Sequence, residues 1–584
     1  MTEPAHQAPP YPTIYMDRAA SAPSTVVLAG QRAQALEVGR TRLLVTGIVF
    51  ALAFFAIGWR LIDLAVSGHG ARARLATADG TAPATTLRAD IVDRNGALLA
   101  TSVSAASLYA DPREIPDPRA AADALIRVLP ALSHGELLTK LASRRRFVWL
   151  KRNLTPREEY AVNRLGIPGL HFRRAPRRIY PYGELTAHAV GFTDIDGSGL
   201  SGIERAFDSA LRGADMPLAL SLDVRVQHVV AAEMAAAMEK FDAVGGAGLV
   251  LDVRTGELLA MVSLPTFDPN RRDKASPDAL FNRASLGVYE MGSVFKIFTT
   301  AMALDAGVVD LADGYDTSEP IREARYTITD FKPKKRWLSV PEIFMYSSNI
   351  GTARMALKAG GPMQRVFLER IGLSEPATLE IPEVGRPMLP TPWRRINTIT
   401  ASYGQGIAVS PLQIVSATAA VVNGGELHPA TLLRRADGAP PAARRVIAPA
   451  TSRAMRLLMR LVVSHGTGRK AAAPGYLVGG KTGTADKPMN GGYARDKRIA
   501  SFAAAFPMTD PRYAVFIMLD EPKGIKSTYG YATGGWVAAP VVARVVDRIG
   551  PLLGVEPVHD QRGFDARERL LIQTSARARQ VAAN

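Results

Sequence analysis

The sequence of 584 residues contains no cysteine. This absence excludes disulfide bonds, thiol catalysis and cysteine-ligated metal sites, and it leaves the redox compartment open. The nine histidines are scattered, without H-E-x-x-H or any comparable spacing of zinc ligands. We therefore expect neither a metal ion nor another cofactor.

Signatures of nucleic-acid binding are missing as well, since the sequence has no zinc-finger, helix-turn-helix or RNP pattern. The formal net charge of +17 would suit nucleic acid, an anionic membrane surface or an acidic polymer. Basic residues gather at Arg144–Arg146, Arg173–Arg178 and Lys332–Arg336. We interpret these clusters as solvated faces and expect no nucleic-acid partner.

Only one long hydrophobic run is present, from Leu43 to Trp59, and it contains no charged residue. As a helix, these 17 residues would rise about 26 Å, which just spans a bilayer. A core helix would show a polar stripe, and a cleaved signal peptide would start nearer the N-terminus. We expect a transmembrane anchor over residues 43–64, after a flexible tail over residues 1–42. Because arginines flank both ends of the run, charge does not fix its orientation.

Two regions of different character follow the anchor, as expected for a chain of this length. Residues 65–215 mix strand-like runs with Arg-rich loops, whereas residues 216–560 alternate regular strand and helix patterns. Strands at both ends of the second region, with helices between them, predict a mixed α/β domain in which an antiparallel sheet packs against helical layers. We expect the Arg- and Ala-rich residues 561–584 to form a loosely attached basic tail.

Three short motifs indicate the chemistry. Ser293 and Lys296 form the only S-x-x-K, Ser347-Ser348-Asn349 is the only S-x-N, and Lys481-Thr482-Gly483 is the only K-T-G. Each motif alone is weak. In this order, with 54 and then 134 residues between their first positions, they are typical of penicillin-recognising serine acyltransferases.

The first motif predicts an activated nucleophile. A serine hydroxyl attacks poorly until a base takes its proton. Ser293 opens an apolar run that is predicted to be a buried helix, which would place the amine of Lys296 one turn further on the same face. Burial and the positive end of the helix would both favour the neutral amine that a general base requires.

The other two motifs predict how a peptide is held. Ser347 can relay a proton to the leaving amine, and the amide of Asn349 can hold the peptide backbone of the substrate. The segment Lys481–Thr484 is predicted to be an edge strand, with which an extended peptide can pair. Lys481 and the two threonines, Thr482 and Thr484, can hold a terminal carboxylate, and Gly483 permits close backbone approach. The backbone N–H groups of Ser293 and Thr484 are candidate oxyanion donors.

Longer strings extend the resemblance beyond these motifs. RADIVDRNG (88–96), RIYPYG (178–183) and GLSGIE (199–204) resemble the N-terminal boxes of class B penicillin-binding proteins. Ala89 departs from the glycine usual in the first box. The strings around the three motifs and AHAVGFTDIDGSGLSGIERAFD are similar to the division-specific, FtsI-type branch of that family. The resemblance covers about residues 40–550.

The resemblance implies a penicillin-binding transpeptidase fold after an α+β pedestal domain of the class B dimerisation type. It implies a serine D,D-transpeptidase that cross-links peptidoglycan stem peptides at the division septum, anchored in the inner membrane with its N-terminus cytoplasmic and its catalytic domain periplasmic. Implied partners are the D-Ala-D-Ala donor and an amine acceptor, β-lactams as covalent inhibitors, the cytoplasmic membrane, and divisome proteins including a SEDS-type glycosyltransferase. Carried over by position, Ser293 is the nucleophile and Lys296 its base, with Ser347, Asn349 and Lys481 as further catalytic residues.

Three alternatives stay open at this stage. An elongation-specific class B protein would have the same chemistry at another cellular location. A β-lactamase or β-lactam sensor is a second alternative, although no obvious glutamate box for rapid deacylation lies between Asn349 and Lys481. A non-catalytic scaffold is the third, and three intact motifs argue against it.

Overall fold

The computed structural model describes residues 47–48, 50–59, 87–214, 216–435, 443–489, 492–558 and 562–583. The chain divides into two units, residues 1–84 and 85–584. In the first unit, residues 47–48 and 50–59 are helical and their side chains are largely exposed. No helix within the described residues is long and apolar enough to cross a membrane. The predicted anchor at 43–64 lies partly outside the described residues, and the predicted tail at 1–42 lies wholly outside them.

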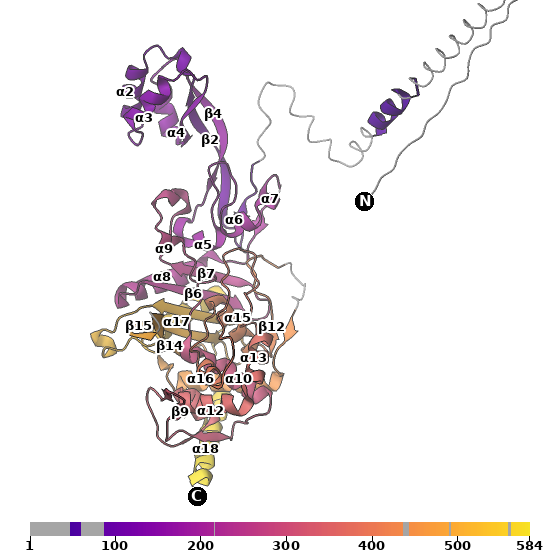
Figure 1. Ribbon diagram of the computed structural model, residues 1–584, viewed down its shortest axis with the longest axis vertical. Helices are drawn as coiled ribbons and strands as arrows, with labels where there is room; N and C mark the ends of the chain where they lie inside the picture. Colours follow the sequence, from indigo (N-terminus) through magenta and orange to yellow (C-terminus); the bar gives the residue numbers. More distant parts are fainter. Residues whose placement is uncertain are drawn as a thin grey trace, which may run out of the picture. The chain divides into compact units, whose positions relative to one another are not determined.

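The second unit begins with a pedestal built on a five-stranded sheet in the order β3-β2-β1-β5, in which β4 also pairs with β2. Helices α2, α3 and α4 lie on one side of the long β2–β4 ribbon (Figure 1) and share a hydrophobic cluster with it. The elements are β1 (Ile91–Val92), β2 (Leu98–Ala110), α2 (Pro118–Val128), α3 (His134–Leu141), β3 (Val148–Leu154), α4 (Pro156–Asn163), β4 (Leu170–Ile179) and β5 (Leu218–Ala219).

A buried ionic network lies at the base of the pedestal. Glu204 is fully buried and accepts hydrogen bonds from Arg88 Nε at 2.5 Å and Arg178 Nε at 2.7 Å. Nearby apolar residues such as Ile91 belong to the same hydrophobic cluster as the core of the following domain. This base contains α5 (Ala187–Val190), α6 (Gly202–Ala206) and α7 (Asp208–Leu211).

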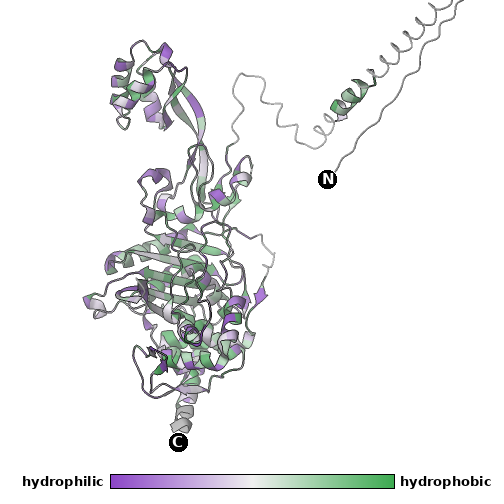
Figure 2. Ribbon diagram, viewed as in Figure 1, coloured by the Kyte–Doolittle hydropathy of each residue, from purple (hydrophilic) through white to green (hydrophobic). Residues whose placement is uncertain are grey.

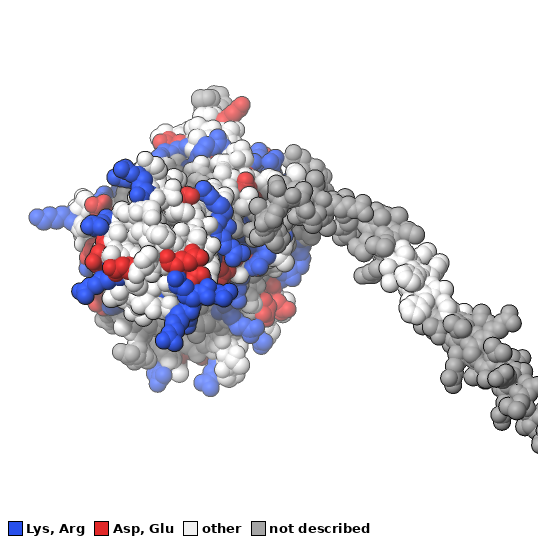
Figure 3. Space-filling view, turned by 90° about the horizontal axis from the view of Figure 1, so that it is seen from above, with Lys and Arg blue, Asp and Glu red and all other residues white. Residues whose placement is uncertain are grey.

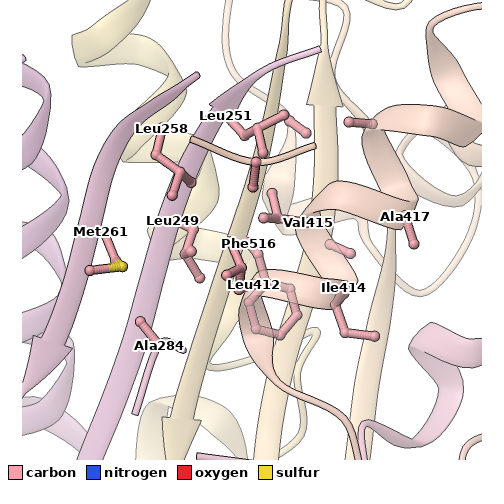
Figure 4. Close-up of a cluster of buried hydrophobic side chains, with 14 of the residues drawn as sticks. Leu249, Leu251, Leu258, Met261, Ala284, Leu412, Ile414, Val415, Ala417 and Phe516 are labelled. Atoms are coloured by element: carbon pink, nitrogen blue, oxygen red, sulfur yellow. The ribbon is translucent and has the colours of Figure 1, made fainter. Parts of the chain in front are cut away.

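The following domain is built on an antiparallel sheet in the order β14-β15-β16-β6-β7. Because strand side chains alternate, Val515 and Ile517 of β16 pack with helices α8 and α17 on one face. Phe516 packs with α15 on the other face, among the residues of Figure 4. The strands are β6 (Gly245–Asp252), β7 (Leu258–Leu264), β14 (Gly479–Met489), β15 (Gly492–Phe506) and β16 (Tyr513–Asp520).

Helices cover both faces of this sheet, and apolar residues concentrate in the strands and the helices next to them (Figure 2). The predicted antiparallel sheet with helical layers is therefore confirmed. The helices are α8 (Val224–Phe241), α9 (Pro277–Leu280), α10 (Lys296–Asp305), α11 (Val340–Tyr346), α12 (Asn349–Ala359), α13 (Gly361–Arg370), α14 (Arg395–Ala401), α15 (Pro411–Val422), α16 (Pro449–Ser464) and α17 (Ala538–Leu552). Short strand pairs complete the domain: β8 (Gly314–Asp316) with β11 (Trp337–Ser339), β9 (Ile321–Glu323) with β10 (Tyr326–Ile328), and β12 (Glu426–Leu427) with β13 (Arg444–Arg445).

Most residues of the three basic clusters are exposed, as interpreted, but the side chain of Arg178 is only 4% exposed and belongs to the buried network at the base of the pedestal. Seen from above, Lys and Arg side chains project around the molecule, and acidic side chains lie between them (Figure 3). Many basic residues of the pedestal have an acidic partner, as in the ion pairs Lys151–Glu158 at 2.5 Å and Arg174–Glu159 at 2.9 Å.

The expectation of a loosely attached C-terminal tail is wrong. Residues Arg562–Ala583 form helix α18, which contacts α11, α16 and β11. Glu568 and Ser575 on this helix are buried. The sequence was misleading because only every third or fourth residue of this Arg- and Ala-rich segment contacts the domain, which is enough to bind one face of a helix.

Candidate active site

Ser293 lies on a single 3₁₀ turn, Gly292–Phe295, that leads directly into α10. Gly292 has a φ of +54°, and a Cβ at this position would lie 2.3 Å from the backbone oxygen of Thr484. Only glycine tolerates both this conformation and this contact. The backbone of the first motif is therefore held directly against the strand that carries the third motif.

Lys296 is the first residue of α10 and is fully buried. Its Nζ lies 3.0 Å from Ser293 Oγ, as predicted for residues one turn apart. The same nitrogen lies 2.7 Å from Asn349 Oδ1, 2.7 Å from the backbone oxygen of Ser347 and 3.1 Å from Ser347 Oγ. Lys296 thus connects the first motif to the second.

Ser347 lies at the junction between α11 and α12, in the left-handed conformation with a φ of 62°. This conformation ends α11, and Ser348 starts α12 by capping the N–H of Gly351. The abrupt junction turns Ser347 Oγ toward Lys296 and Lys481, which lie 3.1 and 2.9 Å away. The hydroxyl therefore bridges the two lysines.

Lys481 lies on β14, an edge strand of the sheet, as predicted. Its side chain is fully buried. The neighbouring residue, Thr482, is hydrogen-bonded to Thr467, with 2.9 Å between the two hydroxyl oxygens. A Cβ on Gly483 would lie 2.6 Å from the backbone oxygen of Met291, so glycine is required for the close approach of the strand. Thr484 Oγ1 accepts a hydrogen bond from the N–H of Gly534 at 3.1 Å.

The protonation of the two lysines is coupled. Burial lowers the pKa of Lys296 to about 7, against the opposing effect of the negative charge of Asp330. Burial and the proximity of Lys296 hold the pKa of Lys481 well below its usual range. Two ammonium groups around one buried hydroxyl repel each other, so the charged form of one lysine disfavours the charged form of the other. A substrate carboxylate next to Lys481 would favour its charged form and leave Lys296 neutral.

Asp330 is a site residue that the sequence motifs did not predict. Its carboxylate accepts hydrogen bonds from the N–H groups of Asn349 at 2.5 Å and Ile350 at 3.0 Å and from Ser348 Oγ at 2.7 Å. It therefore caps α12 and fixes the second motif. A loop residue almost twenty positions earlier gives no local signal of this role.

Thr467 was missed for the same reason. It belongs to a turn after α16, and only the fold brings it to Thr482. Within the part of the chain that the structure describes, no group of three or more His, Asp or Glu side chains could hold a metal ion.

Comparisons with known proteins identify the family of the chain. Residues 246–547 match the penicillin-binding protein transpeptidase domain, and residues 83–218 match the penicillin-binding protein dimerisation domain. The chain is 43% identical over 482 residues to the probable peptidoglycan D,D-transpeptidase FtsI of Caulobacter vibrioides, covering 80% of this chain and 82% of that protein. It is 30% identical over 508 residues to the peptidoglycan D,D-transpeptidase FtsI of Escherichia coli strain K12, covering 81% and 84%.

A similar fold occurs in the crystal structure of penicillin-binding protein 3 from Mycobacterium tuberculosis in complex with aztreonam. The TM-score is 0.65 with 25% sequence identity, covering 81% of this chain and 98% of that one. The two matched domains and the extent of these similarities lead to one conclusion: the chain belongs to the class B penicillin-binding proteins, which join a dimerisation domain to a transpeptidase domain.

Proposed function

We propose that the protein is a peptidoglycan D,D-transpeptidase that cross-links stem peptides at the division septum through an acyl-enzyme on Ser293. The observation that carries the proposal is the position of Lys296, which is fully buried with its Nζ 3.0 Å from Ser293 Oγ. Burial at this position lowers the pKa of the amine to about 7. A neutral amine at this distance can take the hydroxyl proton at physiological pH.

In the first half-reaction, Ser293 Oγ attacks the carbonyl carbon between the two D-alanines of a donor stem. Its proton passes to Lys296, and the N–H groups of Ser293 and Thr484 are the proposed donors to the oxyanion. The C–N bond then breaks, and the departing D-alanine amine receives a proton through Ser347, which lies between the two lysines. The product is an ester of Ser293.

In the second half-reaction, the amine of a neighbouring stem attacks this ester. A new C–N bond forms, the ester C–O bond breaks, and a proton of the attacking amine returns to Ser293 through Lys296. The free edge of β14 suits an extended donor peptide, while Asn349 holds its backbone amides and Lys481, Thr482 and Thr484 hold its carboxylate. A β-lactam would acylate the same serine.

A direct assay tests the reaction itself. The purified full-length protein should release D-alanine from a donor peptide ending in D-Ala-D-Ala and join the remaining acyl group to an added amine. Hydrolysis of penicillin at a high rate, without transfer to the amine, would instead favour a β-lactamase.

The pH dependence of acylation follows from Lys296. Because its amine acts as a base only when neutral, the rate of acylation by a β-lactam should rise with pH and level off above an inflection near pH 7. Stopped-flow measurements between about pH 5.5 and 9 check this, within the range where the ring carboxylate of penicillin stays ionised. A profile that is flat across this range would contradict the assignment of Lys296 as the base.

Asp330→Asn should move that inflection. The negative charge of Asp330 raises the pKa of Lys296 and therefore opposes the effect of burial. An asparagine of the same shape still caps α12 but removes the charge, so the inflection should shift below that of the wild type. An unchanged inflection would show that Asp330 has no electrostatic influence on Lys296.

The proposal also includes a location at the division septum and an anchor in the membrane. They are supported by the names of the two FtsI relatives and by the uncharged run Leu43–Trp59. We propose residues 43–64 as the anchor in the cytoplasmic membrane, a cytoplasmic N-terminus and a periplasmic catalytic domain. Contact with divisome proteins, including a SEDS-type glycosyltransferase, belongs to the same proposal.

Depletion of the protein separates division from elongation. Cells that lose a septal enzyme should form smooth filaments, whereas round cells would favour the elongation-specific alternative. Complementation with Ser293→Ala should fail. Restored division by this variant would favour the non-catalytic scaffold.

A further inference from the structure

The C-terminal helix α18 contacts both helices that lead into the active site. Four residues at helical spacing, Phe564, Glu568, Leu571 and Ser575, form its less exposed face. Glu568 and Ser575 are each only 3% exposed, although both are polar. The helix extends to Ala583. A buried polar group that loses its partner cannot exchange it for water, so a shift of such a contact is energetically costly.

One contact leads to the second motif. The hydroxyl of Ser339 donates a hydrogen bond to Ser575 Oγ at 2.7 Å, and both side chains are buried. Ser339 is the N-cap of α11 and forms a capping box with Glu342. The other end of this seven-residue helix is Ser347, whose hydroxyl bridges the two catalytic lysines. A rigid helix about 10 Å long therefore joins α18 to Ser347.

A second contact leads to the third motif. The carboxylate of Glu568 lies 3.5 Å from Arg460 Nε and 3.9 Å from His465 Nδ1, at the end of α16. Arg460 also donates a hydrogen bond to the backbone oxygen of Val478, just before β14, at 3.1 Å. Two residues after His465 lies Thr467, which contacts Thr482. Glu568 is thus connected to β14 at two points.

Helix α11 and the connection from α16 to β14, which form two walls of the active site, also pack against each other. A Cβ on Gly466, in the turn after α16, would lie 2.7 Å from the backbone oxygen of Met345, near the end of α11. By contrast, the hydrophobic clusters on the two faces of the sheet consist of residues before α18, and among the described side chains of this helix Phe564 alone packs against them. Helix α18 therefore adds little to the core while holding both walls of the site.

We propose that α18 is a positioning element for the transpeptidase reaction: Ser575 and Glu568 hold α11 and the α16–β14 connection, and so set the distances among Ser347, Lys481 and Ser293. This inference rests on the proposed acyl-enzyme function. Displacement of the helix should slow acylation in molecules that are otherwise folded, because a shift of ~1 Å in a catalytic group costs up to about 10²-fold in rate.

The test measures acylation by fluorescent penicillin in the full-length protein and its variants. Glu568→Lys places a cation next to Arg460 and His465. The rate constant of the acylation step should fall between about tenfold and about 10²-fold, with little change in the dissociation constant of the preceding complex. Glu568→Asp keeps the carboxylate and should recover most of the rate. Gln573→Ala, on the exposed face of α18, is the matched control and should react as the wild type does.

A chain that ends at Val558 provides a second variant and should show the same slow acylation step. Since this rate constant is a property of each folded molecule, a merely structural role would lower the amount of titratable enzyme and leave the constant unchanged. That result, or wild-type kinetics for Glu568→Lys, would overturn the inference. If the wild-type protein itself did not become acylated, the proposed function would fail instead.

Discussion

Replacing Lys296 with alanine should slow acylation of Ser293 by about 10²–10⁴-fold, the range that general-base catalysis contributes. The variant loses the only amine within 3.0 Å of Ser293 Oγ among the described residues, and it also loses the contacts that join Ser347 and Asn349 to the first motif. The measurement is the second-order rate constant for reaction with a β-lactam at pH 8, where the wild-type amine is largely neutral.

Lys358→Ala is the control, because it replaces a lysine by alanine at an exposed position on α12, outside the site. It should react at the wild-type rate. A Lys296→Ala variant that kept more than about a tenth of the wild-type rate would contradict the role of Lys296 as base. General-base catalysis typically contributes at least about 10²-fold, so its loss should slow the reaction by more than about tenfold.

Replacing Glu204 with alanine should lower the free energy of unfolding by about 3–5 kcal/mol, as expected when one partner of a buried ionic network is removed. Glu204 is fully buried, and its carboxylate pairs with Arg88 and Arg178, whose side chains are 6% and 4% exposed. Without it, the buried guanidinium of Arg178 has no ion-pair partner among the described residues, and Arg88 keeps only its ion pair with Asp208 at 2.8 Å.

The free energy is measured by urea unfolding of the variant and the wild type under identical conditions. Asp196→Ala is the comparison, because Asp196 pairs with Arg152 at 2.7 Å but is 70% exposed, so its loss should cost less than about 1 kcal/mol. Equal stability of the Glu204 and Asp196 variants would show that burial of the network has no energetic consequence.

Local sequence patterns predicted the parts of the site that local structure determines. The spacing of Ser293 and Lys296 placed the two side chains one turn apart, and the run before Lys481 predicted an edge strand. Strand patterns at both ends of residues 216–560, with helix patterns between them, predicted an antiparallel sheet packed against helical layers, and every residue of β6 and β16 is buried.

Contacts between distant segments were not predictable in this way. Asp330 caps the second motif from a separate loop, and Thr467 reaches Thr482 from the turn after α16. Helix α18 was expected to be a loose tail because its composition is polar and its contacts depend on Glu568 and Ser575, which look like ordinary surface residues in the sequence. Their burial follows from the tertiary structure alone.

The central claim is that Ser293 forms the acyl-enzyme, and mass spectrometry of the β-lactam-treated protein tests it most directly. After proteolysis, the peptide that contains Ser293 should carry the mass of one β-lactam, and no adduct should form in Ser293→Ala. An adduct on another residue, or labelling that persists in Ser293→Ala, would contradict the account.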